Sequence, residues 1–199
     1  MSAVTSRLQI IIASTRPGRV GQAVGRWFEQ RARGHGGFEV EVVDLLELDL
    51  PFMDEPNHPR LHDYTHRHTK EWSARVEAAD AFAFVMPEYN HGFTAPLKNA
   101  IDYLNVEWQF KPVGLVSYGG VAAGTRAAQM LKPVLTVLKM TPLAEAVSIP
   151  FVAQFIDDDG EIVANETMEQ SADAMLSELL RVSQALRPLR ASADAALRS

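Results

Sequence analysis

A polar stretch, "STRPGRVG" at residues 14–21, follows the first apolar run of the chain and carries groups that bind phosphate. Ser14 and Thr15 offer hydroxyl donors, Arg16 offers a charged fork, and the helix expected next would present free backbone amides at its N-terminus. The spacing matches neither G-x-G-x-x-G nor G-x-x-x-x-G-K-[ST], which disfavours a dinucleotide or nucleoside triphosphate site. A terminal monophosphate fits better, and an ordinary surface turn with an N-capping serine is the alternative.

Two further stretches, "PEYNHGFT" at 87–94 and "YGGVAAG" at 118–124, place glycine and aromatic residues after other apolar runs. Backbone amides at Gly92, Gly119 and Gly120 could approach a flat ligand closely, because glycine has no side chain. The aromatic surface beside them could come from Tyr89, Phe93, Tyr118 and Trp108. A phosphate cradle beside a planar, amide-lined slot suggests flavin mononucleotide (FMN).

Hydrolysis and metal binding are the other chemistries that these residue types allow. Ser14 or Ser117 could form a triad with His91 and Asp102, but the chain has no G-x-S-x-G elbow, so hydrolysis is disfavoured. A histidine-rich stretch contains His58, His62, His66 and His68. Two of these imidazoles would share a face if the stretch were helical. No carboxylate or cysteine clearly completes a metal shell, which favours a solvated loop without metal.

Strand-like apolar runs alternate with amphipathic, helix-like segments along the chain. The predicted strands cover residues 8–13, 38–45, 81–86, 111–118 and 143–149. The predicted helices cover residues 20–32, 65–79, 94–104, 125–139 and 166–186. This alternation predicts a doubly wound α/β sheet, in which ligands bind beyond the carboxyl ends of the strands where the strand order reverses. That rule selects the loops after the first, third and fourth strands, which contain the three stretches above.

Length and composition are typical of one α/β domain over residues 1–188, with a tail at 189–199 that is predicted to be loose and flexible. A formal charge of −6 without a basic stripe disfavours nucleic acid as a partner. The absence of cysteine excludes disulfides and thiolate chemistry. No apolar run is long enough to span a bilayer and no signal-peptide pattern is present, so a cytoplasmic protein is expected.

These motifs resemble the NADPH-dependent FMN reductase family, the flavodoxin-like group that includes quinone, chromate and azo-dye reductases. The resemblance covers about residues 7–150 and rests on "STRPGR", "PEYNHGFTAPLKNAIDYL" and "KPVGLVSYGG". It implies a parallel five-stranded sheet of order 2-1-3-4-5. By the same resemblance Ser14, Thr15 and Arg16 would bind the FMN phosphate. The isoalloxazine ring would lie against two sets of residues, Pro87, Glu88, Tyr89 and Asn90 on one edge and Ser117, Tyr118, Gly119 and Gly120 on the other.

The resemblance implies an enzyme that passes hydride from NADPH or NADH through bound FMN to a small oxidised acceptor. Quinones, free flavins, azo dyes and oxidised metals are all acceptors of this type. No side-chain acid or base is needed, because the chemistry belongs to the flavin. A homodimer or homotetramer is implied, and the apolar residues Met130, Val134 and Val137 are compatible with it. The alternatives are a flavodoxin-like electron carrier and a non-redox binding protein on the same fold.

Overall fold

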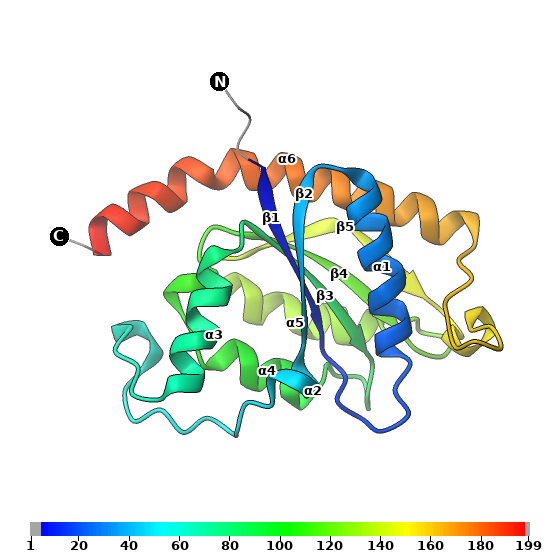
Figure 1. The fold of residues 1–199 in the computed structure, drawn as a ribbon, viewed down its shortest axis with the longest axis horizontal. Helices are drawn as coiled ribbons and strands as arrows, with labels where there is room; N and C mark the ends of the chain where they lie inside the picture. Colours follow the sequence, from blue (N-terminus) through cyan, green and yellow to red (C-terminus); the bar gives the residue numbers. More distant parts are fainter. Residues whose placement is uncertain (1–4, 198–199) are drawn as a thin grey trace.

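A five-stranded, all-parallel sheet forms the centre of the computed structural model, which describes residues 5–197, with side chains as far as residue 192. The strand order is β2-β1-β3-β4-β5, so the predicted doubly wound, flavodoxin-like topology is confirmed (Figure 1). The strands are β1 (Ser6–Ile12), β2 (Phe38–Asp44), β3 (Ala81–Pro87), β4 (Pro112–Tyr118) and β5 (Thr141–Ile149). Each agrees with a predicted strand to within two residues at either end.

Helices cover both faces of the sheet, as the right-handed crossovers between parallel strands require. Apolar residues of α1 and α6 bury one face, and those of α3, α4 and α5 bury the other. Figure 1 shows α6 crossing the top of the view, α1 to the right of the strands, α3 at the lower left and α4 at the bottom. The helices are α1 (Gly21–His35), α2 (Leu45–Leu48), α3 (Arg67–Ala78), α4 (Ala95–Asp102), α5 (Thr125–Val137) and α6 (Glu166–Leu197). Among the described residues, none of these helices is long and apolar enough to cross a membrane.

The central strands differ from the edge strands in burial. All seven residues of β3 and of β4 are buried, whereas β2 alternates, with exposed Glu39 and Glu41 on one face and buried Phe38 and Val40 on the other. A strand between two neighbours and two helix layers has no solvated face, so it is apolar throughout. The acidic alternation in the sequence therefore marked β2 correctly as an edge strand.

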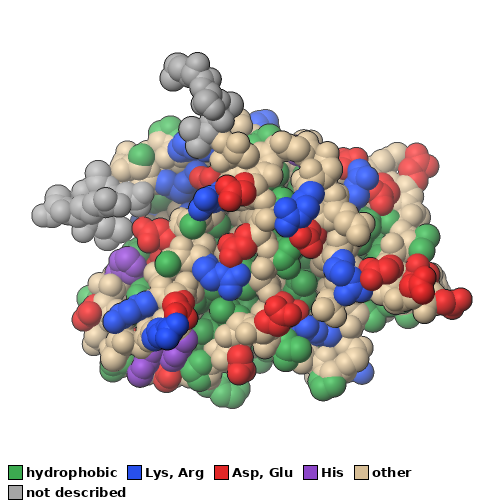
Figure 2. Space-filling view, viewed as in Figure 1, with side chains coloured by type: hydrophobic (Ala, Val, Ile, Leu, Met, Phe, Trp, Pro, Cys, Tyr) green, Lys and Arg blue, Asp and Glu red, His purple; other side chains and the backbone are tan. Residues whose placement is uncertain are grey.

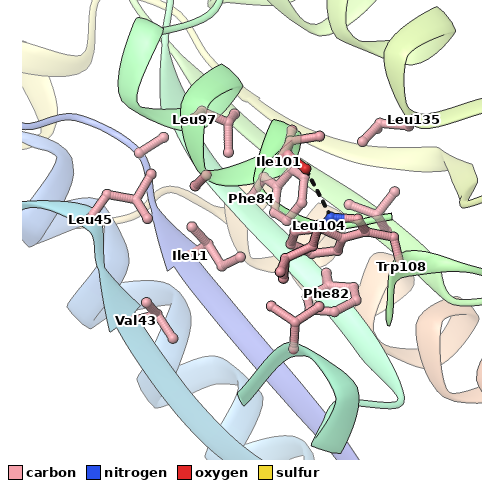
Figure 3. Close-up of a cluster of buried hydrophobic side chains, with 14 of the residues drawn as sticks. Ile11, Val43, Leu45, Phe82, Phe84, Leu97, Ile101, Leu104, Trp108 and Leu135 are labelled. Atoms are coloured by element: carbon pink, nitrogen blue, oxygen red, sulfur yellow. Dashed lines mark hydrogen bonds between the residues drawn. The ribbon is translucent and has the colours of Figure 1, made fainter. Parts of the chain in front are cut away.

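Trp108 lies inside the core on the α3–α5 side of the sheet, so the prediction that it offers a ligand-binding surface is wrong. Its side chain is completely buried in the 3-10 helix Val106–Trp108, and its indole N–H donates to the Ile101 carbonyl at 3.1 Å. The ring centroid lies 5.0 Å from that of Phe82. Figure 3 shows the indole among side chains of β3 and α4. Burying so large an apolar side chain in the core stabilises the fold, so the indole is not available to a ligand.

The last helix continues past the point where the sequence predicts it to end. The prediction stops the helix at residue 186 and leaves loose chain after Pro188, but α6 runs on to Leu197 with Pro188 inside it. Proline removes one helical hydrogen bond. Arg190 offsets that loss, because its guanidinium lies 2.7 Å from Asp80 Oδ1 and donates to the Phe110 carbonyl. This docking against the sheet holds the helical turn beyond the proline.

Candidate functional site

The three loops singled out in the sequence meet at the carboxyl edge of the sheet, at the switch point between β1 and β3. The Ser14 hydroxyl, after β1, lies 2.9 Å from the Tyr89 hydroxyl, after β3. Glu88, also after β3, forms an ion pair with Arg126 in the first turn of α5, which follows the β4 loop. The structure thus brings the three stretches together where open α/β sheets bind their ligands.

The loop between β1 and α1 leaves several hydrogen-bond donors without a partner. The backbone N–H groups of Thr15, Arg16 and Gly18 donate to no other described residue. The exposed Arg16 guanidinium likewise makes no hydrogen bond or ion pair with the described chain, whereas Ser14 is buried at 1% exposure. Gly18 turns the chain with φ 69°, a conformation that favours glycine. Free amides and an arginine at the N-terminus of a helix are the donors that an anion requires.

A buried ion pair that the sequence analysis missed fixes this loop in place. Arg19 donates to both carboxylate oxygens of Asp44, at 2.6 and 2.5 Å, and to the Ser14 carbonyl at 2.5 Å. The two side chains are only 9% and 7% exposed. The sequence did hold a signal, because Asp44 ends the second strand and pairs in register with Ile12 of the first. An acid at that position lies beside the loop after the first strand.

Tyr118 reaches the same loop from the end of β4. Its side chain is 3% exposed, and its hydroxyl has no hydrogen-bond partner of ordinary geometry in the described chain. Burial, with a smaller contribution from the neighbouring Tyr89, raises the pKa of the Tyr118 phenol above its usual range. A Cβ on Gly21 would lie 2.4 Å from the phenol oxygen and 3.4 Å from Ser14 Cβ. The hydroxyl therefore lies between Ser14 and the first residue of α1.

The loop after β3 is a tight two-residue hairpin. Tyr89 and Gly92 exchange two backbone hydrogen bonds of 2.9 Å, and Asn90 and His91 between them have φ of 51° and 67°. Positive φ at both central residues is the type I′ pattern, which asparagine tolerates better than most residues. The hairpin presents Asn90 and His91 to solvent and fixes the backbone from Pro87 onwards.

Two of the three glycine amides that were predicted to line a flat ligand are engaged within the protein. The Gly92 N–H donates to Tyr89 and the Gly119 N–H donates to the Ile149 carbonyl at 3.2 Å, so neither N–H is free to donate to a ligand. Backbone donors near a folded core are normally paired in this way. The Gly120 N–H donates to no described residue, and the Ser117 hydroxyl is used internally, on the Ala123 carbonyl.

Glu88 anchors the hairpin to α5. Its side chain is 7% exposed and accepts hydrogen bonds from the Arg126 guanidinium and from the Arg126 backbone N–H. These bonds, with that of the guanidinium first, hold the pKa of the Glu88 carboxyl below its usual range. A carboxylate at the N-terminus of a helix is also favoured by the helix dipole. Glu88 is therefore ionised and fixed in position, and is poorly suited to be a proton donor.

The residues considered for other chemistries do not come together. Ser117 bonds to Ala123, and Asp102 pairs with Lys98 one turn earlier in α4, so no triad forms with His91. The histidine-rich stretch is not a continuous helix, because His62 has φ 51° and His66 is the N-cap of α3. Within residues 5–197 no three His, Asp or Glu side chains are grouped so that they could hold a metal ion. Histidines gather at one edge of the face in Figure 2, where acidic and basic side chains are interspersed.

Comparison with known proteins agrees with this geometry. The sequence model of the NADPH-dependent FMN reductase family matches residues 6–154. An NAD(P)H-dependent FMN reductase of Schizosaccharomyces pombe is 39% identical over 151 residues, 74% of this chain and 75% of the relative. An NAD(P)H:quinone oxidoreductase of Solanum tuberosum is 36% identical over 107 residues, 49% of this chain and 50% of the relative. In structure, a flavoenzyme NAD(P)H:acceptor oxidoreductase from Paracoccus denitrificans superposes with a TM-score of 0.72 at 20% identity, over 90% of this chain and 98% of that one.

The fold is thus that of the flavodoxin-like oxidoreductases. The chain belongs to the NADPH-dependent FMN reductase family and is an oxidoreductase that uses FMN and NAD(P)H. The resemblance predicted from the sequence motifs is confirmed. The residues present also fit the cofactor, because the unpartnered amides, Arg16 and the orphaned Tyr118 hydroxyl are donors for which a phosphate group supplies acceptors.

Proposed function

We propose that the loop after β1 binds the FMN phosphate and that the loops after β3 and β4 support the isoalloxazine ring. The observation that carries the proposal is the set of unpartnered donors at Thr15, Arg16 and Gly18, beside the N-terminus of α1. Ser14 and Thr15 add hydroxyls on the same loop. A dianionic phosphate is the part of FMN that needs such a donor set.

The ring would lie between the hairpin and the loop after β4. Pro87, Glu88, Tyr89 and Asn90 would border one edge, and Ser117, Tyr118, Gly119 and Gly120 the other. The Gly120 N–H is the free donor on the second side. Internal hydrogen bonds hold the rest of both loops, so this part of the site supplies rigid walls more than hydrogen bonds.

FMN, when bound, would supply the redox chemistry that links NAD(P)H oxidation to reduction of an acceptor. The protein positions the reactants. The Arg126–Glu88 pair fixes the hairpin, and the Tyr89–Gly92 bonds keep its backbone rigid. Glu88 is ionised and held by Arg126, so at the hairpin it positions the backbone and does not transfer a proton.

A quinone is the acceptor class that we propose. The support is the likeness to the Solanum tuberosum quinone oxidoreductase, together with an exposed hairpin that leaves the ring accessible to a flat molecule. Free flavins, azo dyes and oxidised metals would reach the same edge. A one-electron carrier on the same fold would not consume NAD(P)H steadily, and that difference separates the two functions.

We further propose a cytoplasmic homodimer or homotetramer that associates through α5. Met130 is 56% exposed and Val137 is 72% exposed on that helix. The Met130 sulfur lies against the hairpin, since a Cβ on Gly92 would be 3.2 Å from it. A partner on this face would therefore border the ring. Val137→Arg should give a smaller particle in sedimentation than the unchanged chain, and an unchanged mass would reject the interface.

The test of the function is direct. The purified protein should be yellow or become so with added FMN, and heat should release a flavin that migrates as FMN and not as riboflavin or FAD. Addition of a benzoquinone should then produce steady oxidation of NADPH or NADH. A protein that binds no flavin would reject the proposal. Flavin binding without steady NAD(P)H oxidation would favour the electron carrier.

A further inference from the structure

We propose that the Tyr118 hydroxyl donates a hydrogen bond to the FMN phosphate through a gap left by the missing side chain of Gly21. The inference rests on the proposed function, since it names a phosphate ligand that the sequence motifs place elsewhere. By the motifs Tyr118 would border the ring edge. The geometry of its side chain points instead to the phosphate end of the site.

Burial and the lack of a partner are the first argument. Tyr118 is 3% exposed, and its hydroxyl lies beside Ser14 but makes no hydrogen bond of ordinary geometry within the described chain. A buried hydroxyl without a well-formed hydrogen bond destabilises the fold, so such groups are rare in folded proteins. Burial raises the pKa of this phenol, which keeps it protonated and able to donate. It therefore needs an acceptor, and a phosphate oxygen is a strong one.

The position of the hydroxyl is the second argument. The phenol ring packs in the core on the α1 side of the sheet, with Val24 of α1 in the same cluster. The oxygen lies so close to Gly21 that a Cβ there would be 2.4 Å away, and that same Cβ would be 3.4 Å from Ser14. Gly21 begins the 15-residue helix α1, whose N-terminus faces the loop with free amides. The hydroxyl, Ser14 and the helix end thus converge on one point.

The requirement for glycine at position 21 follows from this packing and not from backbone conformation. Gly21 is absent from the positions with positive φ, so its backbone would accept any residue. Only the Tyr118 oxygen, at 2.4 Å, is too close; the ring carbon behind it would lie 3.5 Å from an added Cβ, an ordinary contact. The absence of a side chain at Gly21 therefore makes room for the Tyr118 hydroxyl.

The first experiment compares FMN with riboflavin, which lacks the phosphate, on the apoprotein of Tyr118→Phe by flavin fluorescence quenching. FMN affinity should fall about tenfold or more, the loss expected for a hydrogen bond to a charged group, while riboflavin affinity stays within twofold. The midpoint of thermal unfolding of the flavin-free variant should be unchanged or higher, because an unsatisfied buried group has been removed.

Tyr64→Phe is the matched control. Tyr64 is also a buried tyrosine, but its hydroxyl donates to Glu107 at 2.7 Å, far from the three loops in the sequence and on the α3 side of the sheet. Its loss should lower the unfolding midpoint and leave the ratio of FMN to riboflavin affinity unchanged. The two phenylalanine variants should therefore show opposite patterns.

A double-mutant cycle tests the gap at Gly21. In the otherwise unchanged chain Gly21→Ala should weaken FMN binding, because the new methyl group displaces the phenol oxygen. In the Tyr118→Phe background the same alanine meets only ordinary contacts, and it should cost almost nothing further. If the losses of FMN affinity in the two single variants add up in the double variant, the proposed packing of the Tyr118 hydroxyl against Gly21 is wrong.

The outcomes separate the inference from the proposed function. If Tyr118→Phe weakens FMN and riboflavin equally, or weakens neither, the phosphate contact is rejected while FMN binding stands. If the unchanged apoprotein binds neither flavin, the proposed function itself fails. Titration with inorganic phosphate gives an independent check, since phosphate should raise the unfolding midpoint of the unchanged protein more than that of Tyr118→Phe.

Discussion

The two ends of the site differ in what their backbone has left to offer. Around the loop after β1, the N–H groups of Thr15, Arg16 and Gly18 and the Tyr118 hydroxyl make no hydrogen bond of ordinary geometry within the described chain. In the hairpin after β3 and the loop after β4, Gly92 and Gly119 already donate to carbonyls of the protein. The first region has unpaired hydrogen-bond donors that a ligand can use. In the second region the donors bond within the protein and hold its backbone rigid.

This difference teaches how one fold can hold two unlike parts of a ligand. An anionic phosphate needs donors that are already aligned and unsatisfied, so that binding does not first break internal bonds. A flat ring needs walls at a fixed spacing, which a hydrogen-bonded hairpin and a glycine-rich turn supply. The buried Arg19–Asp44 pair, with the Arg19 bond to the Ser14 carbonyl, holds the loop of the first region in place.

The largest effect should come from breaking that support. Arg19→Ala leaves the Asp44 carboxylate buried without its charged partner, so the free energy of unfolding should fall by about 3–5 kcal/mol. Denaturant unfolding at pH 7 measures it. Arg75→Ala is the matched control, because its ion pair with Glu41 is well exposed and should contribute less than about 1 kcal/mol. Equal losses in the two variants would mean that the buried pair does not support the loop.

Arg16→Ala should have the next largest effect. It should lower the affinity for FMN and leave the stability of the flavin-free protein unchanged. Loss of the free guanidinium should weaken FMN binding by about tenfold to a hundredfold, as for a charge-assisted bond to phosphate. The unfolding midpoint without flavin should not change, because Arg16 is exposed and its side chain makes no hydrogen bond or ion pair with a described residue. Isothermal titration of the apoprotein measures the affinity and thermal unfolding without flavin measures the midpoint. An unchanged FMN affinity would remove Arg16 from the phosphate site.

The sequence allowed the fold and the position of the site to be predicted because both follow from periodicity and chain order. Continuous apolar runs at 81–86 and 111–118 identified the central strands, and alternation at 38–45 identified the edge strand. The directions in which side chains point were harder to predict from the sequence. Nothing local shows that Trp108 turns into the core or that the Tyr118 phenol points to α1, because both depend on packing between distant segments.

Hydrogen bonds over long sequence separations account for what else the sequence did not show. The Gly119 amide bonds to Ile149, and Arg190 bonds to Asp80 and so keeps α6 helical beyond Pro188. A single sequence gives no register for such pairs. Arg19 with Asp44 is the exception, since the strand ends alone place them side by side once the sheet order is assumed.

A smaller effect should appear at the ring end, with a dependence on pH. The pKa of Glu88 is lowered in the folded protein, so its bond to Arg126 stabilises the fold above pH ~4.3 and is lost as the pH falls through the lower folded value. Glu88→Gln should therefore have a lower thermal unfolding midpoint than the unchanged protein at pH 6, with a gap that narrows from pH 5 to pH 3. A gap that widens on acidification would contradict the pairing.

The smallest effect is expected at His91. The residue is exposed in the hairpin turn and has no role in the proposed chemistry. His91→Ala should leave the rate of quinone reduction within about twofold of the unchanged enzyme, whereas His91→Gly should slightly raise stability because φ of 67° suits glycine. A loss of activity of a hundredfold in both variants would show that the imidazole takes part in the reaction.

Hydrogen exchange of individual backbone amides, with and without FMN, tests the contrast between the two regions most directly. The amides of Thr15, Arg16 and Gly18 should exchange fast in the flavin-free protein and slow down strongly when FMN binds. Those of Gly92 and Gly119 should already be protected and change little. If FMN instead protects the glycine amides and leaves the three loop amides exchanging as before, the phosphate is not bound where the free donors lie.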